Sequence, residues 1–114
     1  MHEFGLAEGV LDAVRRRAAG REVRRVRVRA GVRHGIDAAS MALAFRLAAQ
    51  GTEAEYAALD LVPAPARLSC RSCGRSTQTY DLLARCPACD ADAVDLAGGD
   101  ELLLESLTYA AAGP

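Results

Sequence analysis

Four cysteines are the residues in this chain whose types and spacing best fit metal chemistry, and they fall in two short pairs. Cys70 is paired with Cys73, and Cys86 with Cys89, each across two residues. That spacing lets a tight turn aim both thiolates at one point, and four thiolates complete the tetrahedral shell that structural zinc prefers. Because four protein ligands leave no open coordination position, the pattern predicts a structural Zn(II) site rather than a catalytic one.

Paired cysteines have three other common uses: a redox site, disulfide bonds and an iron–sulfur cluster. A redox Cys-x-x-Cys site requires only one pair, whereas this chain has two. Disulfide bonds are typical of secreted proteins and other proteins of oxidising compartments. The N-terminus does not read as a secretory signal, because Glu3, Glu8 and Asp12 interrupt it. An iron–sulfur cluster also takes four cysteines, but short paired turns suit a single metal ion better. We therefore predict zinc, in a cytoplasmic protein.

His2, at the start of the chain, could form a second metal-binding site. The α-amine of Met1, the amide nitrogen of His2 and the imidazole can bind one metal ion in adjoining chelate rings. Nitrogen-rich, square-planar sites of this type favour Ni(II) or Cu(II). The alternative interpretation is that His2, like most histidines near a terminus, is only solvated.

The helices and strands that must position these residues are predicted from the spacing of apolar side chains. Residues 4–19 read as an amphipathic helix, because apolar residues recur at steps of three and four: Ala7, Val10, Leu11, Val14 and Ala18. Alternation then predicts a half-buried strand whose solvated face carries Arg25, Arg27, Arg29 and Arg33. Asp37 is placed to N-cap a second helix reaching about Gln50, whose inner face carries Met41, Leu43, Phe45 and Ala48.

Two further strands complete the predicted fold. Residues 56–62 alternate with Leu59 and Leu61 inward, until Pro63 and Pro65 break the pattern. Residues 101–109 read as a third strand. The predicted fold is α+β: two helices packed on a three-stranded, mainly antiparallel sheet, with an inserted zinc-ribbon module. Residues 1–63 plus 98–110 are predicted to form the α+β domain, and residues 64–97 the zinc-binding domain.

Three motifs, in this order, resemble those of the HypA family of nickel metallochaperones. They are Met1-His2-Glu3 opening a helix, the twin Cys-x-x-Cys insert, and the segment 98–102, Gly-Gly-Asp-Glu-Leu. The resemblance covers residues 1–109. It implies nickel at His2, with Met1 and Glu3 as neighbours and Asp37 completing the site, and zinc at the four cysteines. It also implies delivery of Ni(II) for maturation of [NiFe]-hydrogenase, with a nickel-handling GTPase and the hydrogenase large-subunit precursor as partners.

The sequence leaves several alternatives open. Asp37 could be a helix cap, a nickel ligand or both, and His34 could be a solvated loop residue or a further ligand. The client could be urease in place of hydrogenase. A nucleic-acid-binding zinc ribbon has thin support, because the net charge is −1 and few basic or aromatic residues lie between the cysteine pairs. The sequence shows no nucleophile–base pair, phosphate loop or apolar run of about 18 residues, so we predict neither an enzyme nor a membrane protein.

Overall fold

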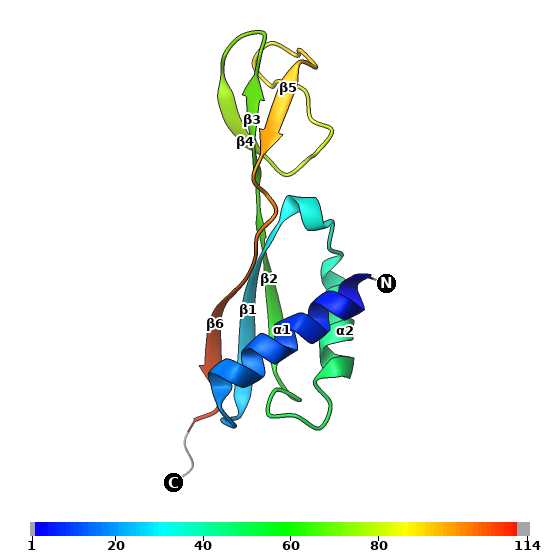
Figure 1. Cartoon of the computed structure of the whole chain (residues 1–114), viewed down its shortest axis with the longest axis vertical. Coiled ribbons are helices and arrows are strands. Elements are labelled where there is room, and N and C mark those ends of the chain that lie inside the picture. Colours follow the sequence, from blue (N-terminus) through cyan, green and yellow to red (C-terminus); the bar gives the residue numbers. More distant parts are fainter. Residues whose placement is uncertain (1, 112–114) are drawn as a thin grey trace. The chain divides into compact units, whose positions relative to one another are not determined.

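The computed structural model describes residues 2–111 and contains two α-helices and two three-stranded sheets (Figure 1). Within the described residues, the chain divides into two compact units. The helical unit comprises residues 2–29, 36–62 and 103–111, and the cysteine unit comprises residues 30–35 and 63–102. No helix within residues 2–111 has the length and apolar character needed to cross a bilayer. The domain bounds predicted above, 1–63 plus 98–110 and 64–97, stay predictions.

The helical unit is built on a sheet of strand order β2-β1-β6. Its strands are β1 (Val23–Gly31), β2 (Ala58–Ala64) and β6 (Leu102–Tyr109). Helices α1 (His2–Ala18) and α2 (Ala38–Ala48) lie side by side on one face of this sheet (Figure 1). The predicted α+β class is therefore confirmed.

The core of the helical unit lies between the helices and the sheet. Every residue of the predicted α1 stripe is buried, namely Ala7, Val10, Leu11, Val14 and Ala18. In α2 the prediction was partly wrong, since Leu43 is 49% exposed and Ala44 is buried in its place. The reason is helical geometry: Ala44 and Phe45 follow Met41 by three and four residues, whereas Leu43 falls two residues on, off that face.

The bounds of β1 and β2 differ from the predictions. Strand β2 does not end before Pro63 but runs through it to Ala64. A proline can lie in β2 because this strand is at the edge of the sheet, where one side of the backbone needs no partner. At the end of β1, Val32 and Arg33 leave the strand and enter a 3-10 helix, η1 (Val32–His34).

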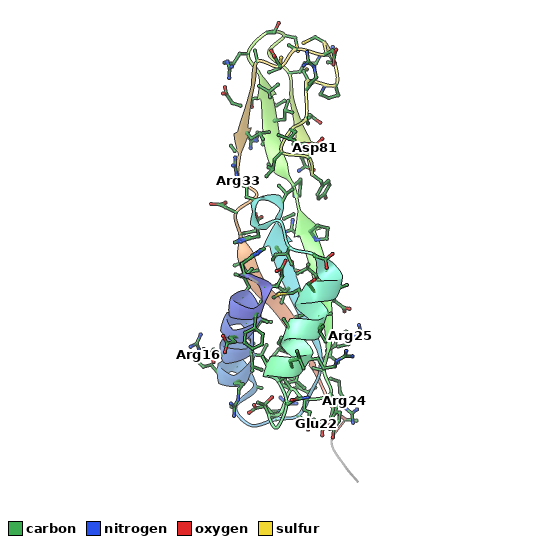
Figure 2. All side chains as sticks on the ribbon, turned by 90° about the vertical axis from the view of Figure 1, so that its right-hand side faces the viewer. Arg16, Glu22, Arg24, Arg25, Arg33 and Asp81 are labelled. Carbon is green, nitrogen blue, oxygen red and sulfur yellow. The ribbon has the colours of Figure 1, made fainter. Side chains whose placement is uncertain are left out.

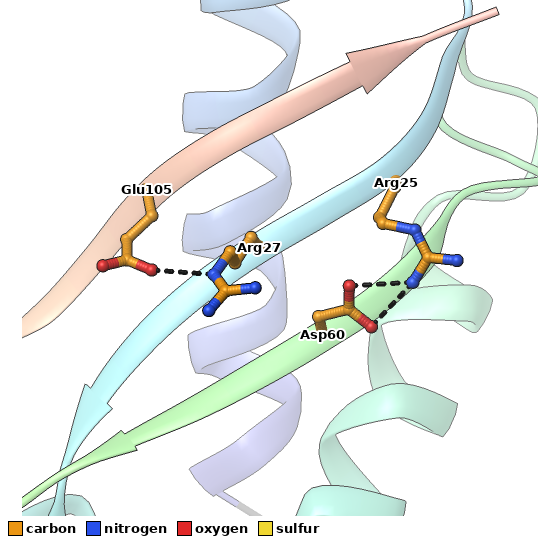
Figure 3. A network of polar contacts seen from close by, with 4 residues as sticks. All are labelled: Arg25, Arg27, Asp60 and Glu105. Carbon is orange, nitrogen blue, oxygen red and sulfur yellow. Dashed lines mark hydrogen bonds and ion pairs between the residues drawn. The ribbon is translucent and has the colours of Figure 1, made fainter.

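The sheet face opposite the helices carries Arg25 and Arg27 of the predicted arginine row (Figure 3). Arg25 on β1 donates to both carboxylate oxygens of Asp60 on β2, at 2.9 and 2.8 Å. Arg27 donates to Glu105 on β6 at 3.1 Å. Acidic residues on both neighbouring strands thus neutralise much of the cationic row, which fits a solvated sheet face.

The cysteine unit contains the second sheet, of strand order β4-β3-β5. Its strands are β3 (Ala66–Cys70), β4 (Ser76–Thr79) and β5 (Val94–Ala97), and β3 pairs antiparallel with both neighbours. Of the seven largest fully buried side chains of the described chain, only Leu68 belongs to this unit. So small an apolar core cannot be expected to stabilise a module of this size without a further cross-link.

Candidate metal centres

The first cysteine pair lies in a tight turn at the end of β3. The amide of Cys70 donates to the carbonyl of Arg75 at 2.9 Å, and the amide of Gly74 donates back to the carbonyl of Cys70 at 2.9 Å. Gly74 has a φ of 79°, a left-handed conformation that glycine adopts without steric cost. The amide of Cys73 lies 3.4 Å from the Cys70 sulfur, so the turn also directs a backbone donor at the thiolate.

The second pair repeats this turn with different residues. The amide of Cys86 donates to Ala91 at 2.9 Å, and the amide of Asp90 donates to Cys86 at 2.8 Å. Asp90 takes the place that glycine has in the first turn and adopts a φ of 62°. Aspartate adopts this left-handed backbone conformation less readily than glycine but more readily than most other residues. The two turns are therefore structurally equivalent, and we call them the first and the second knuckle.

The four sulfur atoms converge on one point. Their Sγ atoms all lie within 4.8 Å of one another. Cys70 and Cys89 are 3.7 Å apart, and Cys73 and Cys86 are 3.6 Å apart. Four sulfurs at about 2.3 Å from a central zinc ion form a tetrahedron with edges of about 3.8 Å. The observed spacing therefore fits a tetrahedral metal site.

Electrostatics in the cluster also favour a bound cation. The backbone N–H of Cys73 lowers the pKa of Cys70 to about 7, and that of Cys89 lowers the pKa of Cys86. For Cys89, the N–H of Ala91 lowers the pKa, but burial and the neighbouring sulfurs outweigh it and raise the pKa to about 11. Negative charges on adjacent thiolates repel one another, which raises the pKa of the last thiol to ionise. A bound divalent metal ion offsets this repulsion and favours the thiolate form of all four cysteines.

A second cluster of polar groups lies where α1 and α2 begin. The carboxylate of Glu3 accepts a hydrogen bond from the backbone N–H of Asp37 at 3.3 Å, although 34 residues separate them. The Nδ1 atom of His2 lies 3.5 Å from the other carboxylate oxygen of Glu3. Three of the residues expected at the nickel site are thus linked in a chain of contacts. The fourth, Met1, lies outside the described residues.

Asp37 caps α2, as the sequence predicted. Its Oδ2 atom accepts from the backbone N–H of Ser40 at 2.9 Å and from the Ser40 hydroxyl at 2.7 Å. Both bonds fall on one oxygen, which leaves Oδ1 available within the described part of the chain. The role of Ser40 was not predicted from the sequence, although a residue three positions after an N-cap is where the cap accepts its backbone hydrogen bond.

The carboxylates of this cluster are held in their charged form. The Ser40 hydroxyl, followed by the Ser40 backbone N–H, lowers the pKa of Asp37. The pKa of Glu3 is lowered by its own backbone N–H and then by the N–H of Asp37. Both side chains are therefore anionic at neutral pH, which is the form that binds a metal cation.

His34 and Arg33 belong to the cysteine unit, whereas Asp37 belongs to the helical unit. The Nε2 atom of His34 is 2.9 Å from the backbone carbonyl oxygen of Asp100. Arg33, labelled in Figure 2, donates to the carbonyls of Leu96 at 3.0 Å and Gly98 at 2.7 Å. The prediction that Arg33 lies on the solvated strand face is wrong, because η1 redirects its side chain toward these carbonyls.

Comparison with known proteins identifies relatives over nearly the whole chain. The family described as "Hydrogenase/urease nickel incorporation, metallochaperone, hypA" matches residues 1–109. "Hydrogenase maturation factor HypA" of Desulfitobacterium hafniense (strain DSM 10664 / DCB-2) is 34% identical over 110 residues, covering 94% of this chain and 96% of that protein. The protein of the same name from Syntrophus aciditrophicus (strain SB) is 35% identical over 106 residues, covering 90% and 93%.

Solved structures show the same fold. The solution structure of the Ni metallochaperone HypA from Helicobacter pylori matches with a TM-score of 0.61 at 23% identity, covering 96% of this chain and 98% of that one. A second solution structure of a HypA protein matches with a TM-score of 0.59 at 24% identity, covering 98% of each chain. The fold and the family predicted from the three sequence motifs are therefore confirmed.

Proposed function

The chain belongs to the HypA family of nickel metallochaperones, and we propose on that premise that it binds Ni(II) at its N-terminus and delivers it for maturation of [NiFe]-hydrogenase. His2 supplies the imidazole and backbone nitrogen, the α-amine of Met1 completes the chelate, and Glu3 and Asp37 provide neighbouring carboxylates. The role involves transfer of an ion and requires no catalytic step by the protein.

The observation that carries this proposal is the hydrogen bond from the N–H of Asp37 to Glu3 at 3.3 Å. It joins the first turn of α1 to the cap of α2, and therefore brings a second anionic group to the terminal motif. Amine, amide and imidazole nitrogens match the preference of Ni(II) for tetragonal nitrogen-rich sites. The His2 side chain is 54% exposed, which suits a site that must exchange its ion with a partner.

The four cysteines are proposed to hold Zn(II) as a structural ion. Cys70, Cys73, Cys86 and Cys89 supply four sulfur donors, so no coordination position is left for a substrate. When bound, zinc would cross-link the two knuckles of a unit whose apolar core is small. The sulfur spacing described above supports this assignment.

The proposed partners are a nickel-handling GTPase of the maturation pathway, which supplies the ion, and the hydrogenase large-subunit precursor, which receives it. Hydrogenase is favoured over urease as the client because the matched relatives quoted above are named for hydrogenase maturation. We propose neither a nucleic-acid partner nor a membrane partner, and a cytoplasmic location fits a site built from reduced cysteines.

A transfer assay tests the proposed delivery. The zinc-containing protein is loaded with one equivalent of nickel and mixed with the purified hydrogenase large-subunit precursor, and the metal content of each protein is measured after separation. Nickel is expected on the precursor, and the His2→Ala variant is expected to deliver none. Transfer to apo-urease at an equal or greater rate would reassign the client, and retention of all nickel on the chaperone would contradict delivery.

A second experiment tests the terminal amine. The protein is produced with Met1 as its first residue, and separately with a Gly-Ser extension that converts the α-amine of Met1 into an amide. The extended protein should fold, retain zinc and lose most of its nickel affinity. Equal nickel affinity in the two forms would exclude the amine as a ligand.

A further inference from the structure

The sheet of the cysteine unit has two edges, β4 and β5, and the pairing with β3 determines which backbone groups of β4 point outward. The amide of Cys70 donates to the carbonyl of Arg75, which lies opposite it. Hydrogen-bonded pairs recur at every second residue of an antiparallel ladder, so Thr77 is the next residue that bonds to β3. The N–H and C=O groups of Ser76 and Gln78 therefore face away from β3, toward the outer edge of β4.

The outer edge of β5 is already covered by groups of the same unit. By the same alternation, the outward backbone groups of this strand are those of Val94 and Leu96. The N–H of Val94 donates to the carbonyl of Asp92 at 2.9 Å, and the carbonyl of Leu96 accepts from the side chain of Arg33 at 3.0 Å. Arg33 is labelled in Figure 2. A further strand could add to β5 only by breaking these hydrogen bonds.

The outer edge of β4 has no such cover within residues 2–111. In that part of the chain, the outward N–H and C=O groups of Ser76 and Gln78 make no hydrogen bond. Residues 76–78 are exposed, and β4 contains neither a charged residue nor a proline. Charges, prolines and covering groups are the usual features that prevent an edge strand from pairing with another chain. Strand β4 is therefore an open edge that can accept one more strand.

This open edge is complementary to itself in one antiparallel register. When Thr77 lies opposite Thr77 of a second copy, Ser76 of each chain lies opposite Gln78 of the other. Each outward N–H of these two residues then meets an outward C=O, as in a regular antiparallel ladder. No other register pairs Ser76 with Gln78 in both directions. Threonine side chains that lie directly opposite each other across two strands also stabilise a sheet.

The charges that flank β4 favour the same arrangement. Arg75 precedes the strand, and its exposed side chain has no partner within the described residues. Asp81 follows the strand, and only one of its carboxylate oxygens accepts a hydrogen bond, from the N–H of Leu83 at 2.9 Å. Antiparallel pairing about Thr77 brings the Arg75 end of each strand beside the Asp81 end of the other, within diagonal reach of a long side chain. Parallel pairing would instead place like charges side by side.

We propose that the cysteine unit pairs with a second copy of this chain through β4. The two three-stranded sheets then join into one sheet of six strands, in the order β5-β3-β4-β4-β3-β5. A two-fold axis at Thr77 relates the copies, so the contact is closed, and the covered β5 edges prevent further growth of the sheet. The contact is short, so the dimer should form reversibly as the protein concentration rises. This inference does not depend on nickel delivery.

Substitution of Gln78 separates the outer edge from the fold. The N–H of Gln78 faces away from β3, so proline removes the outward donor and leaves the pairing of β4 with β3 intact. Gln78→Ala removes only the side chain and is the matched control. In sedimentation velocity experiments on the zinc-containing protein, from about 10 μM to about 1 mM, the parent and Gln78→Ala should dimerise, whereas Gln78→Pro should stay monomeric. All three proteins should contain the same amount of zinc.

Arg75→Glu provides a second test that leaves the backbone unchanged. The Arg75 side chain has no partner within the described residues, so the fold should be unaffected, but like charges would meet at both ends of the paired strands. This variant should dimerise at least about tenfold more weakly than the parent. Hydrogen exchange locates the contact: the amides of Ser76 and Gln78 should be protected only at high protein concentration. The amide of Thr77, which bonds to β3, should be protected at every concentration.

Three outcomes would overturn the proposal. The first is a parent protein that stays monomeric up to about 1 mM. The second is a Gln78→Pro variant that retains its zinc and dimerises like the parent, or an equal loss of the dimer in Gln78→Ala. The third is a dimer in which the amides of Ser76 and Gln78 exchange at the same rate at low and high concentration, which would place the contact elsewhere. If Gln78→Pro loses its zinc, Arg75→Glu and the exchange rates of the parent decide.

Discussion

Asp37 shows how one side chain can serve both the fold and a metal site. One of its carboxylate oxygens accepts both hydrogen bonds from Ser40, and its backbone N–H donates to Glu3. The residue thus begins α2 and at the same time links this helix to the first turn of α1. Its second carboxylate oxygen is the group that we propose as a neighbour of nickel.

A pair of substitutions separates these two roles of Asp37. Asparagine also caps helices but lacks the charge, whereas alanine loses both properties. Asp37→Asn and Asp37→Ala should both weaken nickel binding, by on the order of tenfold, as for other groups that support a metal ligand. Only Asp37→Ala should clearly lower the melting temperature. If Asp37→Asn binds nickel like the parent in a calorimetric titration, the residue is a helix cap alone.

The pH dependence of nickel binding identifies the groups that lose protons. Glu3 and Asp37 have lowered pKa values, so both stay ionised from pH 8 to pH 6 and add no pH dependence in that range. An α-amine ordinarily titrates near about 7.7–8.0 and an imidazole near about 6.5, and each binds metal only when deprotonated. Affinity should therefore fall as the pH falls.

The size of that fall tests the ligand set. Protonation of the amine and the imidazole lowers nickel affinity by on the order of 100-fold between pH 8 and pH 6. Release of the His2 amide proton adds a factor of about ten per pH unit, so the full ligand set predicts a fall on the order of 10,000-fold, whereas an imidazole alone gives about fourfold. We expect the larger value from competition titrations against a chelator of known affinity. A change of about fourfold would show that the amine is not a ligand.

At the scale of the elements, a close backbone approach in the cysteine unit depends on Gly31. A Cβ atom added there would lie 2.1 Å from the carbonyl oxygen of Gly99, which cannot move aside like a flexible side chain. The N–H of Gly31 also donates to the carbonyl of Glu101 at 2.7 Å. The segment after β5 is thus fixed against the end of β1 by direct backbone contact.

Substitution of Gly31 should therefore be destabilising for a purely steric reason, since its φ of −68° suits any residue. Gly31→Ala should cost about 1–3 kcal/mol of unfolding free energy, as overpacking typically does. Gly9 lies in α1 with no heavy atom within 4 Å of an added Cβ, so Gly9→Ala should stabilise by roughly 0.5–1 kcal/mol. Urea unfolding measures both, and equal effects in the two variants would contradict the contact.

The elements that the sequence predicted well are those with a regular apolar period. The apolar stripe of α1 and the alternating apolar residues of β1 are buried, as predicted, because the period of the apolar residues determines which side chains face the core. Strand β4 of the cysteine unit has no such signal. All four residues of β4, Ser-Thr-Gln-Thr, are polar, so only pairing with β3 defines them as a strand. Long-range contacts such as that between Glu3 and Asp37 leave no local pattern either.

At the scale of the whole molecule, the two units are stabilised by different means. The helical unit contains six of the seven largest fully buried side chains, among them Phe45 and Met41. The cysteine unit contains only Leu68. Structural zinc contributes on the order of 10–16 kcal/mol to the folding of small zinc-finger peptides, which is ample for a module with so small a core.

Removal of the zinc should consequently unfold one unit and spare the other. Cys70→Ala should lose zinc, and the amides of residues 66–97 should then exchange rapidly with solvent. Amides in α1 and α2 should stay protected, because the core of the helical unit contains no metal ligand from the cysteine cluster. Residue-resolved hydrogen exchange provides the measurement. Loss of protection throughout the chain would show that the helical unit depends on zinc.

The central claim is that nickel and zinc occupy separate sites, with nickel at His2 and zinc at the four cysteines. The most direct measurement is a nickel titration of the parent and the His2→Ala variant, with zinc quantified in the same samples. His2→Ala should retain one zinc per chain and its thermal stability, because the side chain of His2 is exposed, and should lose nickel binding. A variant that binds nickel as tightly as the parent does would contradict the claim.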